Sequence, residues 1–404
     1  MTNRALVIAA LADGRSVVRR PLRSRDTELM VTGLRALGAG ITLLDGQWHV
    51  DGVGGRPRVI TPRIDVGLAG TVARFLPPIA ALADAAVHLD GDVRMRERPM
   101  APLLRALRDL GVHVDAAPQD RLPCIVHGAG SVRGGDVVVD ASTSSQLVSG
   151  LLLAAPYFGE GLVVRHQGPS VPSRPHIDMT IAMMRAAGAG VDGPEPDVWV
   201  VRPGGYHARD IEVEPDLSGA SAFLAAAVAT GGSVAVPGWP ESTTQPGRAL
   251  LDLLTRMGAT WTSTRDGMLL TGPKSIAGID ADLRDCPEMT PAIAVLAALA
   301  HSASRLTGVA HIRLQETDRI AALAGGLAQL GADVDELPDG LIIRPSRLRG
   351  VALQAHDDHR LAMAWAVLGL VVDGITVDDI ATTSKTMPDF VERWSAMLAS
   401  SSAA

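Results

Sequence analysis

The stretch Arg4-Ala-Leu-Val-Ile-Ala-Ala-Leu-Ala12 is an apolar, helix-like run, and a β-rich run follows it. The same pair of runs returns five more times along the 404 residues. The six copies are Arg4–Pro21, Val72–Asp90, Ser145–Arg165, Ala220–Pro237, Thr290–Thr307 and Arg360–Val377. Their first residues are about 70 residues apart, and a period this regular predicts a chain built from copies of one structural unit. Loops at equivalent points of each unit should then converge.

A second run, amphipathic in character, alternates with the first. In Glu28–Leu37 the apolar residues Met30, Leu34 and Leu37 recur at helical spacing. Glycine follows, as is typical of the residue just past a helix C-terminus. The same ending occurs five times, at Leu37-Gly38, Leu110-Gly111, Ala187-Gly188, Met257-Gly258 and Leu330-Gly331. We therefore expect an amphipathic helix in each of these units.

Strands complete the unit. Asp-Gly pairs stand between apolar runs at Asp45-Gly46, Asp266-Gly267 and Asp339-Gly340, which is a strong hairpin signal. Short strands such as Val137–Val139 and Ile211–Val213 lead into the next apolar helix. Each unit therefore reads βαβαββ. Because a chain of 404 residues exceeds one typical core, we expect two domains of three units each, residues 1–214 and 215–404.

Composition excludes several classes of protein. The net charge of −7 does not favour binding to nucleic acid or to a membrane surface. No apolar run approaches the roughly 18 residues of a membrane span, and the N-terminal run recurs inside the chain, unlike a signal peptide. Cys124 and Cys286 lie in different units, which predicts no disulfide and fits the reducing cytoplasm. Of 37 basic residues only Lys274 and Lys385 are lysines, and we expect Lys274 to be a solvated surface residue.

Polar residues gather just before the helices. Capping accounts for the Ser, Thr and Asp residues among them. It does not account for cations, which the helix macrodipole disfavours at a helix start. The exceptions are Arg74, Arg94, Arg319, Arg360 and Lys385. Because a bound anion would compensate these charges, we expect an anion site between the two domains. Five cations indicate more than one phosphate or carboxylate.

Common cofactor and nucleophile signatures are absent from the sequence. It has no phosphate-binding Gly-Lys loop, no dinucleotide fingerprint and no histidines at metal-ligand spacing. Ser144 and Ser145 have no histidine at a recognisable spacing, which argues against a serine nucleophile. We therefore expect no cofactor and no metal, and acid–base chemistry on an anionic substrate. Glu288 and Glu316 are the candidate groups; an ion pair between Glu316 and Arg319 is the alternative interpretation.

Ordered motifs along the whole chain resemble one family. They are Asn3-Arg-Ala-Leu6, Gly67-Leu-Ala-Gly-Thr71 through Arg74, Asp92-Val-Arg-Met-Arg-Glu-Arg-Pro99, Ser144-Ser-Gln146, Ser173-Arg-Pro175, Glu316-Thr-Asp-Arg319, Asp358-His-Arg360 and Ser384-Lys-Thr386 through Pro388-Asp389. Together they resemble the 5-enolpyruvylshikimate-3-phosphate (EPSP) synthases of the high-GC bacterial type. The resemblance implies an inverse α/β barrel fold, with two domains of three βαβαββ units.

The resemblance also implies the reaction and its substrates. The enolpyruvyl group of phosphoenolpyruvate moves to the 5-hydroxyl of shikimate 3-phosphate, and phosphate is released in the inter-domain cleft. Residues implied for shikimate 3-phosphate are Arg4, Ser144, Ser145, Gln146, Ser173, Glu288, His311 and Gln315. Residues implied for phosphoenolpyruvate are Gly70, Arg74, Arg94, Arg319, Arg360 and Lys385. The first domain is then the shikimate 3-phosphate side and the second the phosphoenolpyruvate and catalytic side.

Four residues are implied in catalysis. Glu316 would donate a proton to the methylene carbon of phosphoenolpyruvate, and Glu288 would take the proton of the hydroxyl. Lys385 would neutralise the departing phosphate and move a proton, which an arginine could not do. Asp216, just before the fourth apolar helix, completes the set. We expect a monomer that needs no partner other than its two small substrates.

The sequence departs from the family pattern at three points. The Pro-Gly-Ser-Lys-Ser segment that precedes the Asn-Arg pair in relatives is not present before Asn3, Gln315 stands where relatives carry Lys or His, and His311 stands where some carry Asn. By the repeat, the first unit lacks its leading strand and the last unit lacks its closing hairpin. We expect both gaps to be one gap, filled by a missing N-terminal segment of roughly 20 residues that carries the lysine.

Two alternatives remain at this point. Without that lysine, the chain could be a catalytically impaired or non-catalytic anion-binding paralogue. A UDP-N-acetylglucosamine enolpyruvyl transferase shares the fold, but that family carries a reactive cysteine in the region equivalent to Gly91–Pro99. No cysteine occurs there in this chain.

Overall fold

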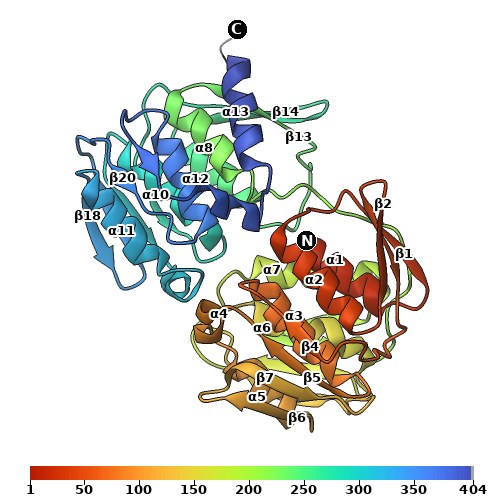
Figure 1. Ribbon diagram of the computed structural model, residues 1–404. Helices are drawn as coiled ribbons and strands as arrows, with labels where there is room; N and C mark the ends of the chain where they lie inside the picture. The colour runs from red at the N-terminus through yellow and green to blue at the C-terminus, as the bar shows by residue number, and fades with distance from the viewer. Residues whose placement is uncertain (402–404) are drawn as a thin grey trace. The chain divides into compact units, whose positions relative to one another are not determined.

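The computed structural model describes residues 1–401, which form two compact units (Figure 1). One unit comprises Met1–Leu22 with Asp26–Glu214, and the other comprises Arg23–Arg25 with the described residues from Pro215 onward. Each unit has its own buried apolar cluster. Among the described residues, no helix combines the length and the apolar character that crossing a bilayer requires.

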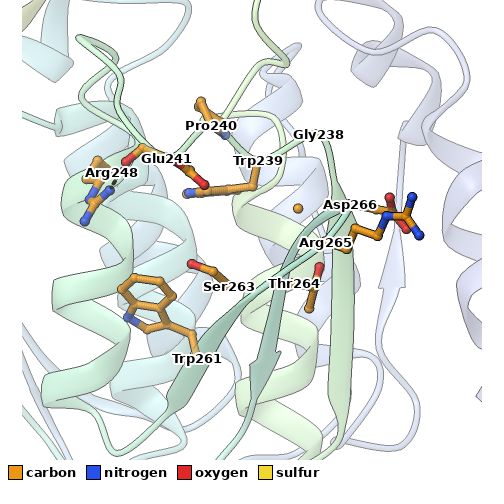
Figure 2. A pocket seen from close by; sticks show the side chains of 11 residues that line it. Gly238, Trp239, Pro240, Glu241, Arg248, Trp261, Ser263, Thr264, Arg265 and Asp266 are labelled. Atoms are coloured by element: carbon orange, nitrogen blue, oxygen red, sulfur yellow. Dashed lines mark hydrogen bonds between the residues drawn. The ribbon is translucent and has the colours of Figure 1, made fainter.

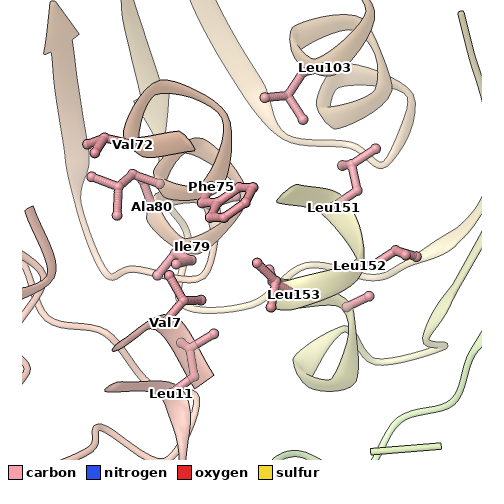
Figure 3. Close-up of a cluster of buried hydrophobic side chains, with 14 of the residues drawn as sticks. Val7, Leu11, Val72, Phe75, Ile79, Ala80, Leu103, Leu151, Leu152 and Leu153 are labelled. Carbon is pink, nitrogen blue, oxygen red and sulfur yellow. The ribbon is translucent and has the colours of Figure 1, made fainter. Parts of the chain in front are cut away.

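Three apolar helices form the centre of each unit. In the first unit they are α1 (Thr2–Leu11), α3 (Gly70–Ala81) and α6 (Gln146–Ala154); in the second they are α8 (Ser221–Thr230), α10 (Thr290–Ala298) and α12 (His359–Leu368). Within each unit all three contact one another. A helix that is apolar on every side belongs in the interior, and Figure 3 shows side chains of α1, α3 and α6 gathered in one cluster.

Amphipathic helices cover these central helices with one face. They are α2 (Arg25–Ala36), α5 (Ala101–Asp109), α7 (Pro175–Ala186), α9 (Arg248–Arg256), α11 (Arg319–Gln329) and α13 (Phe390–Ser401). Gly38, Gly111, Gly188, Gly258 and Gly331 follow the first five, all with φ between +88° and +106°. Only glycine adopts this conformation without strain, which confirms the predicted helix ends. Shorter helices are α4 (Val93–Glu97) and the 3-10 turns η1 (Ala155–Tyr157), η2 (Pro287–Met289), η3 (Ala310–Leu314) and η4 (Ile380–Lys385).

Among the described residues, the four-stranded sheets share one strand order. A leading strand runs parallel to the strand that follows the apolar helix, and a hairpin pairs antiparallel on its other side. The first unit holds β1 (Arg15–Arg19), β2 (Gly40–Leu44), β3 (Gln47–Asp51), β4 (Arg63–Asp65), β5 (Ala86–Asp90), β6 (His113–Ala117), β7 (Arg121–His127), β8 (Gly135–Val139), β9 (Leu162–His166), β10 (Val191–Glu195), β11 (Val198–Val201) and β12 (Ile211–Glu212). The second holds β13 (Ser233–Pro237), β14 (Thr260–Thr264), β15 (Gly267–Thr271), β16 (Asp280–Asp282), β17 (Ser304–Thr307), β18 (Asp333–Leu337), β19 (Gly340–Arg344), β20 (Ala352–Leu353) and β21 (Thr376–Val377).

The first sheet corrects one expectation from the repeat. Its order is β12-β1-β3-β2, so its leading strand is present and is supplied by the end of the third βαβαββ repeat. We expected Ile211–Val213 to open the fourth βαβαββ repeat instead. Val18 pairs with Ile211, and Arg19 forms an ion pair with Asp210 at 2.6 Å. The pairing with β12 covers an edge of β1 that would otherwise be unpaired. As a result, within the described residues the sheet β13-β15-β14 has no leading strand.

Both cysteines are buried free thiols, as the sequence predicted. Burial raises the pKa of Cys124 and of Cys286 to about 12. Thiols with such a pKa are poor nucleophiles at neutral pH. Neither residue is therefore suited to covalent chemistry.

Two central helices of the first unit approach closely at Gly150 of α6. A Cβ at this position would lie 2.2 Å from the carbonyl oxygen of Arg74 in α3. Four residues after Arg74 in the same helix, Pro78 has no N–H to donate to that carbonyl. Proline and glycine thus act together, because the glycine lets α6 pack directly on this carbonyl.

The close approach predicts a selective loss of stability. Gly150→Ala should lower the free energy of unfolding by about 1–3 kcal/mol, because the methyl group has no room. Gly325→Ala in α11 is the matched control, since its Cβ would meet nothing within 4 Å. It should be neutral or stabilise by up to about 1 kcal/mol through helix propensity. Urea denaturation followed by circular dichroism measures both; equal effects would contradict this packing.

Candidate functional site

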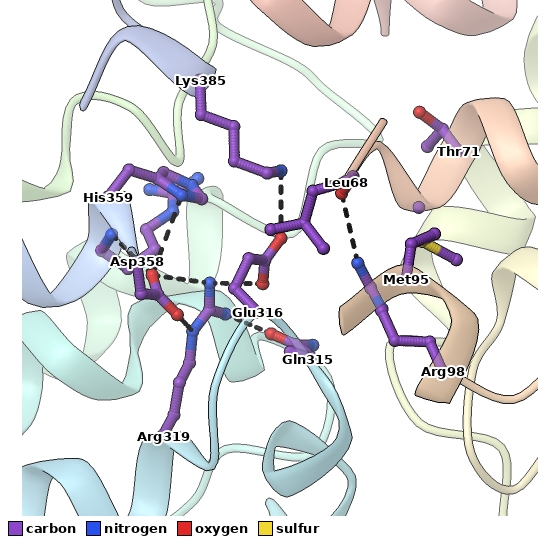
Figure 4. A network of polar contacts seen from close by, with 12 residues as sticks. Leu68, Thr71, Met95, Arg98, Gln315, Glu316, Arg319, Asp358, His359 and Lys385 are labelled. Atoms are coloured by element: carbon purple, nitrogen blue, oxygen red, sulfur yellow. Dashed lines mark hydrogen bonds and ion pairs between the residues drawn. The ribbon is translucent and has the colours of Figure 1, made fainter. Parts of the chain in front are cut away.

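The Arg319 guanidinium is the centre of a buried polar network in the second unit (Figure 4). It stands at the first position of α11, after the capping residue Asp318. Its Nε donates to Asp358 Oδ2 at 2.7 Å and its Nη2 to Oδ1 at 3.1 Å, a bidentate pair. Nη2 also donates to Glu316 Oε2 at 3.0 Å, and Nη1 donates to the side-chain oxygen of Gln315.

Charge explains how this arginine remains ionised in the interior. Burial alone would lower the pKa of Arg319, but the carboxylates of Asp358, Glu316 and Glu288 raise it above its ordinary value. Asp358 is fully buried, and it also accepts from the backbone N–H of Arg360 as the N-cap of α12. One carboxylate therefore fixes both the arginine and the start of the neighbouring helix.

Lys385 approaches the same network from η4. Its Nζ lies 3.0 Å from Glu316 Oε1, while Arg319 holds the other oxygen of this carboxylate. Both the lysine and the glutamate side chains are more than nine-tenths buried. Arginine does not release a proton near neutral pH. Lysine can do so when it is buried, so the contact joins Glu316 to a group that can exchange a proton with it.

A third cation, Arg360, makes a separate contact. Its guanidinium donates to the carbonyl and the hydroxyl oxygens of Ser218, at 2.6 and 3.0 Å. The Ser218 hydroxyl donates in turn to Asp216 at 2.7 Å. Although burial alone would raise it, the charge of Arg360 and this hydrogen bond lower the pKa of Asp216. The structure thus links Asp216 to Arg360 through a serine that the sequence analysis did not select.

Two histidines in the second unit are held neutral. Burial lowers the pKa of His311 to about 4, against the opposing influence of Glu288, while Arg319 and Arg284 lower it further. Burial, followed by the charges of Lys385 and Arg360, lowers the pKa of His359 well below its usual value. Neutral imidazoles at these positions add no positive charge beside the three cations.

The helix-start cations correct the electrostatic argument from the sequence. Arg319 and Lys385 each have a carboxylate partner within the protein. Arg94 pairs with Glu97 at 2.7 Å, and Arg74 donates to the carbonyl of Pro99 at 2.8 Å. Partners within the chain therefore supply much of the compensation that we expected from a bound anion. The cations alone do not require a ligand.

In the first unit, Arg4 is a buried cation with neutral partners. Its Nε donates to the Thr180 hydroxyl at 2.6 Å, its Nη2 donates to the carbonyl of His176 at 3.2 Å, and the guanidinium lies over the Phe75 ring. Burial lowers the pKa of Arg4 to about 10. Among residues 1–401, none of the contacts recorded for Arg4 is to a carboxylate. A buried charge of this kind is costly unless an anion joins it.

Small polar groups gather at the start of α6. Ser145 is the N-cap residue, yet its side chain makes no capping hydrogen bond. The Ser144 hydroxyl accepts from the backbone N–H of Gln146 at 3.2 Å. A Cβ on Gly70, at the start of α3, would lie 2.9 Å from the Gln146 side-chain oxygen and 3.0 Å from Arg98. Glycine at position 70 therefore keeps the space between these two side chains open.

Arg74 and Ser173 are placed differently from one another. Arg74 is 2% exposed, and it links α3 to the sulfur of Met95 in α4 and to the carbonyl of Pro99 just after α4. Ser173 has φ +53°, a strained conformation for a residue with a side chain. Its neighbour Arg174 pairs with Asp197 at 2.5 Å.

The two lysines of the chain differ in burial. Lys274 is exposed, as the sequence predicted, whereas Lys385 is buried.

None of these groups lines the cavity beside the β14–β15 hairpin (Figure 2). That cavity has a volume of about 470 Å³. Trp239 and Trp261 lie on its wall, and Arg248 stacks over the Trp261 ring. The polar network around Arg319 is therefore a separate feature of the second unit.

The sequence analysis selected Arg319 and Arg360 but missed the residues that hold them in place. Asp358 and Arg98 appeared only as parts of motifs, and Ser218 was not selected. Arg98 is 8% exposed, and its Nη1 lies 3.5 Å from the Leu68 carbonyl (Figure 4). The useful signal for Asp358 was its place before α12, since an N-cap aspartate with a second free oxygen can also bind an arginine.

Known proteins resemble this chain over nearly all of its length. Residues 1–394 match the family model described as EPSP synthase (3-phosphoshikimate 1-carboxyvinyltransferase). The chain is 50% identical over 408 aligned positions to the 3-phosphoshikimate 1-carboxyvinyltransferase of Mycobacterium ulcerans, covering 99% of this chain and 93% of that protein. Two EPSP synthase structures from Acinetobacter baumannii superpose with a TM-score of 0.80, at 26% and 25% identity. They cover 97% and 98% of this chain, and 92% of each of those chains. These matches confirm the predicted inverse α/β barrel.

His311 predicts a pH-dependent stability. Because its pKa is lowered to about 4 in the folded state, the unfolded chain binds this proton more strongly below the usual value of about 6.5. Stability is therefore full above pH 6.5 and falls as the pH is lowered towards 4, by up to about 3 kcal/mol from this residue. His311→Asn should reduce that slope, with His359 retaining part of it.

Urea denaturation between pH 7 and pH 4.5 measures the effect. His301→Asn, at an exposed histidine of the same unit, is the control and should keep the wild-type slope. An unchanged slope in His311→Asn would show that this buried imidazole is not held neutral by its surroundings.

Proposed function

Because the chain belongs to the EPSP synthase family, we propose that it transfers the enolpyruvyl group of phosphoenolpyruvate to the 5-hydroxyl of shikimate 3-phosphate and releases phosphate. The observation that carries the chemistry is the Glu316 carboxylate held between Arg319 and Lys385. This arrangement offers positive charge for an anionic substrate and a route for one proton. The UDP-N-acetylglucosamine transferase and the non-catalytic paralogue are not supported, since the matching family and the relative at 50% identity carry this synthase's name.

Shikimate 3-phosphate is assigned mainly to the first unit. The buried Arg4 cation, whose recorded partners are neutral, supports a role in binding an anionic group of this substrate. Ser144, Ser145 and Gln146 stand at the N-terminus of α6, where hydroxyls and backbone N–H groups suit a phosphate. Ser173 completes the set, and its strained backbone is typical of residues that position a ligand. Glu288, His311 and Gln315 of the second unit are assigned to the same substrate.

Phosphoenolpyruvate is assigned to cations and to one glycine. Arg319, Arg360 and Lys385 supply charge in the second unit, and Arg94 with Gly70 serves in the first. Charge-assisted contacts of this kind contribute about 1.5–3 kcal/mol each. Because Arg74 is buried against Pro99 and Met95, we assign it a positioning role that holds the segment carrying Arg94 and Arg98. This revises its earlier assignment as a direct ligand.

The addition step needs one base and one acid. Glu288 takes the proton of the 5-hydroxyl while the oxygen of that hydroxyl attacks carbon 2 of phosphoenolpyruvate. Glu316 gives a proton to the methylene carbon, which becomes a methyl group. The product is a tetrahedral ketal that still carries the phosphate. Glu316 accepts two cationic contacts in the structure, so its proton must arrive through a partner that can release one, and Lys385 is that partner.

The elimination step reverses the proton transfer. A methyl proton returns to the Glu316–Lys385 pair while the bond between carbon 2 and the phosphate oxygen breaks. The charges of Lys385 and Arg360 stabilise the departing phosphate. The proton held by Glu288 leaves with the phosphate, and the enolpyruvyl ether remains. Asp216 acts through Ser218, which fixes the Arg360 guanidinium.

Gln315 has a structural reason in this chain. Its side-chain oxygen accepts from Arg319, which a lysine at this position could not do because an ammonium group only donates. A neutral acceptor also adds no further cation beside Arg319. This departure from the family pattern is therefore compatible with the proposed chemistry.

The enzyme is further proposed to act as a monomer in the cytoplasm on these two small substrates alone. The net charge of −7 supports the absence of nucleic-acid binding, and the two buried free thiols suit a reducing compartment. The arrangement assigned above uses only side chains of one chain. Size-exclusion chromatography with light scattering tests the oligomeric state.

Lysine chemistry gives the sharpest test of the proposed mechanism. Lys385→Arg keeps the positive charge but removes the exchangeable proton, so kcat should fall by about 10²–10⁴-fold with a smaller change in KM. Lys274→Arg, at the exposed lysine, is the matched control and should leave both constants unchanged. Phosphate release from shikimate 3-phosphate plus phosphoenolpyruvate measures them.

Two outcomes would count against the proposal. Absence of turnover by the wild-type chain with both substrates would remove the enzymatic function for this sequence. Equal activity of Lys385→Arg and Lys274→Arg would leave the activity in place but remove Lys385 from proton transfer.

A further inference from the structure

Two histidines and one aspartate that are not assigned to the reaction converge on the surface of the first unit. His113 and Asp115 lie on β6, and His127 ends β7. The Nε2 atom of His127 lies 2.8 Å from Asp115 Oδ2, and that of His113 lies 3.5 Å from Oδ1. One potential ligand atom from each of the three residues lies within 4.8 Å of the other two.

The register of the hairpin produces this arrangement. His113 pairs directly with His127 across the antiparallel ladder, and Asp115 is two residues further along β6. Side chains two apart on a strand share one face, and directly paired side chains are neighbours across it. The two imidazole rings accordingly stack with centroids 4.3 Å apart and an interplanar angle of 25°. Both rings turn an Nε2 atom towards the same carboxylate.

We propose that His113, His127 and Asp115 form a binding site for a divalent transition-metal ion such as Zn²⁺. Two imidazole nitrogens and one carboxylate oxygen are a ligand set typical of zinc, with remaining positions open to water. In tetrahedral coordination with bonds of about 2.0–2.2 Å, two ligand atoms on one zinc ion lie roughly 3.3–3.6 Å apart. The widest separation here must therefore shorten by about 1 Å to fit this geometry.

The exposure of the three side chains allows this adjustment. The His113 and Asp115 side chains are 70% and 57% exposed, so small rotations meet no packing barrier. The Arg108 guanidinium is a positive charge near Asp115, and it pairs with Asp120 at 2.7 Å.

A bound ion would cross-link two strands at the edge of a sheet. The strand order β4-β5-β7-β6 places β6 at the edge, where strands are held on one side only. The ion would join β6 to β7 through side chains in addition to the backbone ladder. Its effect is therefore on the stability of the first unit, and turnover should not change.

Zinc binding by the purified full chain tests the proposal, with ZnCl₂ as the probe and isothermal titration calorimetry as the measurement. We expect about one tightly bound equivalent, and binding at least roughly tenfold weaker in His113→Asn and in His127→Asn. Zinc should also raise the unfolding temperature of the wild type by roughly 2–4 °C and leave that of both variants unchanged.

His49→Asn is the matched control, because His49 lies on β3 of the first sheet and pairs with Thr42 and Val17 rather than with a histidine. It should bind zinc as the wild type does. Equal zinc affinity in His113→Asn and the wild type would overturn the proposal, and so would no binding by the wild type at roughly 50 μM Zn²⁺. Unchanged phosphate release in both histidine variants shows that they remain folded.

Discussion

The bidentate ion pair between Arg319 and Asp358 is the interaction on which the second unit's chemistry depends. It places a guanidinium in the interior at the start of α11, and the same aspartate caps α12. Removing one partner of a buried pair costs about 3–5 kcal/mol, because the other charge is left without compensation. Arg319 in turn fixes one oxygen of Glu316 and leaves the second to Lys385. The position of the proposed proton donor therefore follows from an ion pair within the protein.

The repeat explains why such groups come together. Each apolar helix begins at an equivalent point of its unit, and polar residues stand at that point in both halves of the chain. In the second unit these are Asp216 before α8, Glu288 before α10 and Asp358 before α12. In the first unit Ser145 precedes α6, while Gly70, which has no side chain, opens α3. Because the central helices of each unit contact one another, residues about 70 positions apart in sequence become neighbours.

Local signals predicted the elements, and long-range contacts escaped prediction. Asp45 and Gly46 both adopt positive φ in the β2–β3 turn, as their sequence indicated. The prediction placed the two-residue strand β12 in the wrong βαβαββ repeat. Its partner Val18 is distant in sequence, and so short a strand has too few residues to show a hydrophobic pattern. The sequence identified the charged residues at the helix starts but not their partners. Arg360 donates to Ser218, 142 positions away, and Arg319 donates to Asp358, 39 positions away. Nothing in a single sequence indicates such pairs.

The central claim is that Glu316 and Lys385 act as one proton-transfer unit. A double-mutant cycle in kcat tests it most directly, with Glu316→Gln, Lys385→Arg and the combined variant measured by phosphate release. The account predicts that the double variant is no slower than the slower single variant, because residues that act as a unit have non-additive effects. Losses that multiply in the double variant would show that the two residues act independently, and would contradict the account.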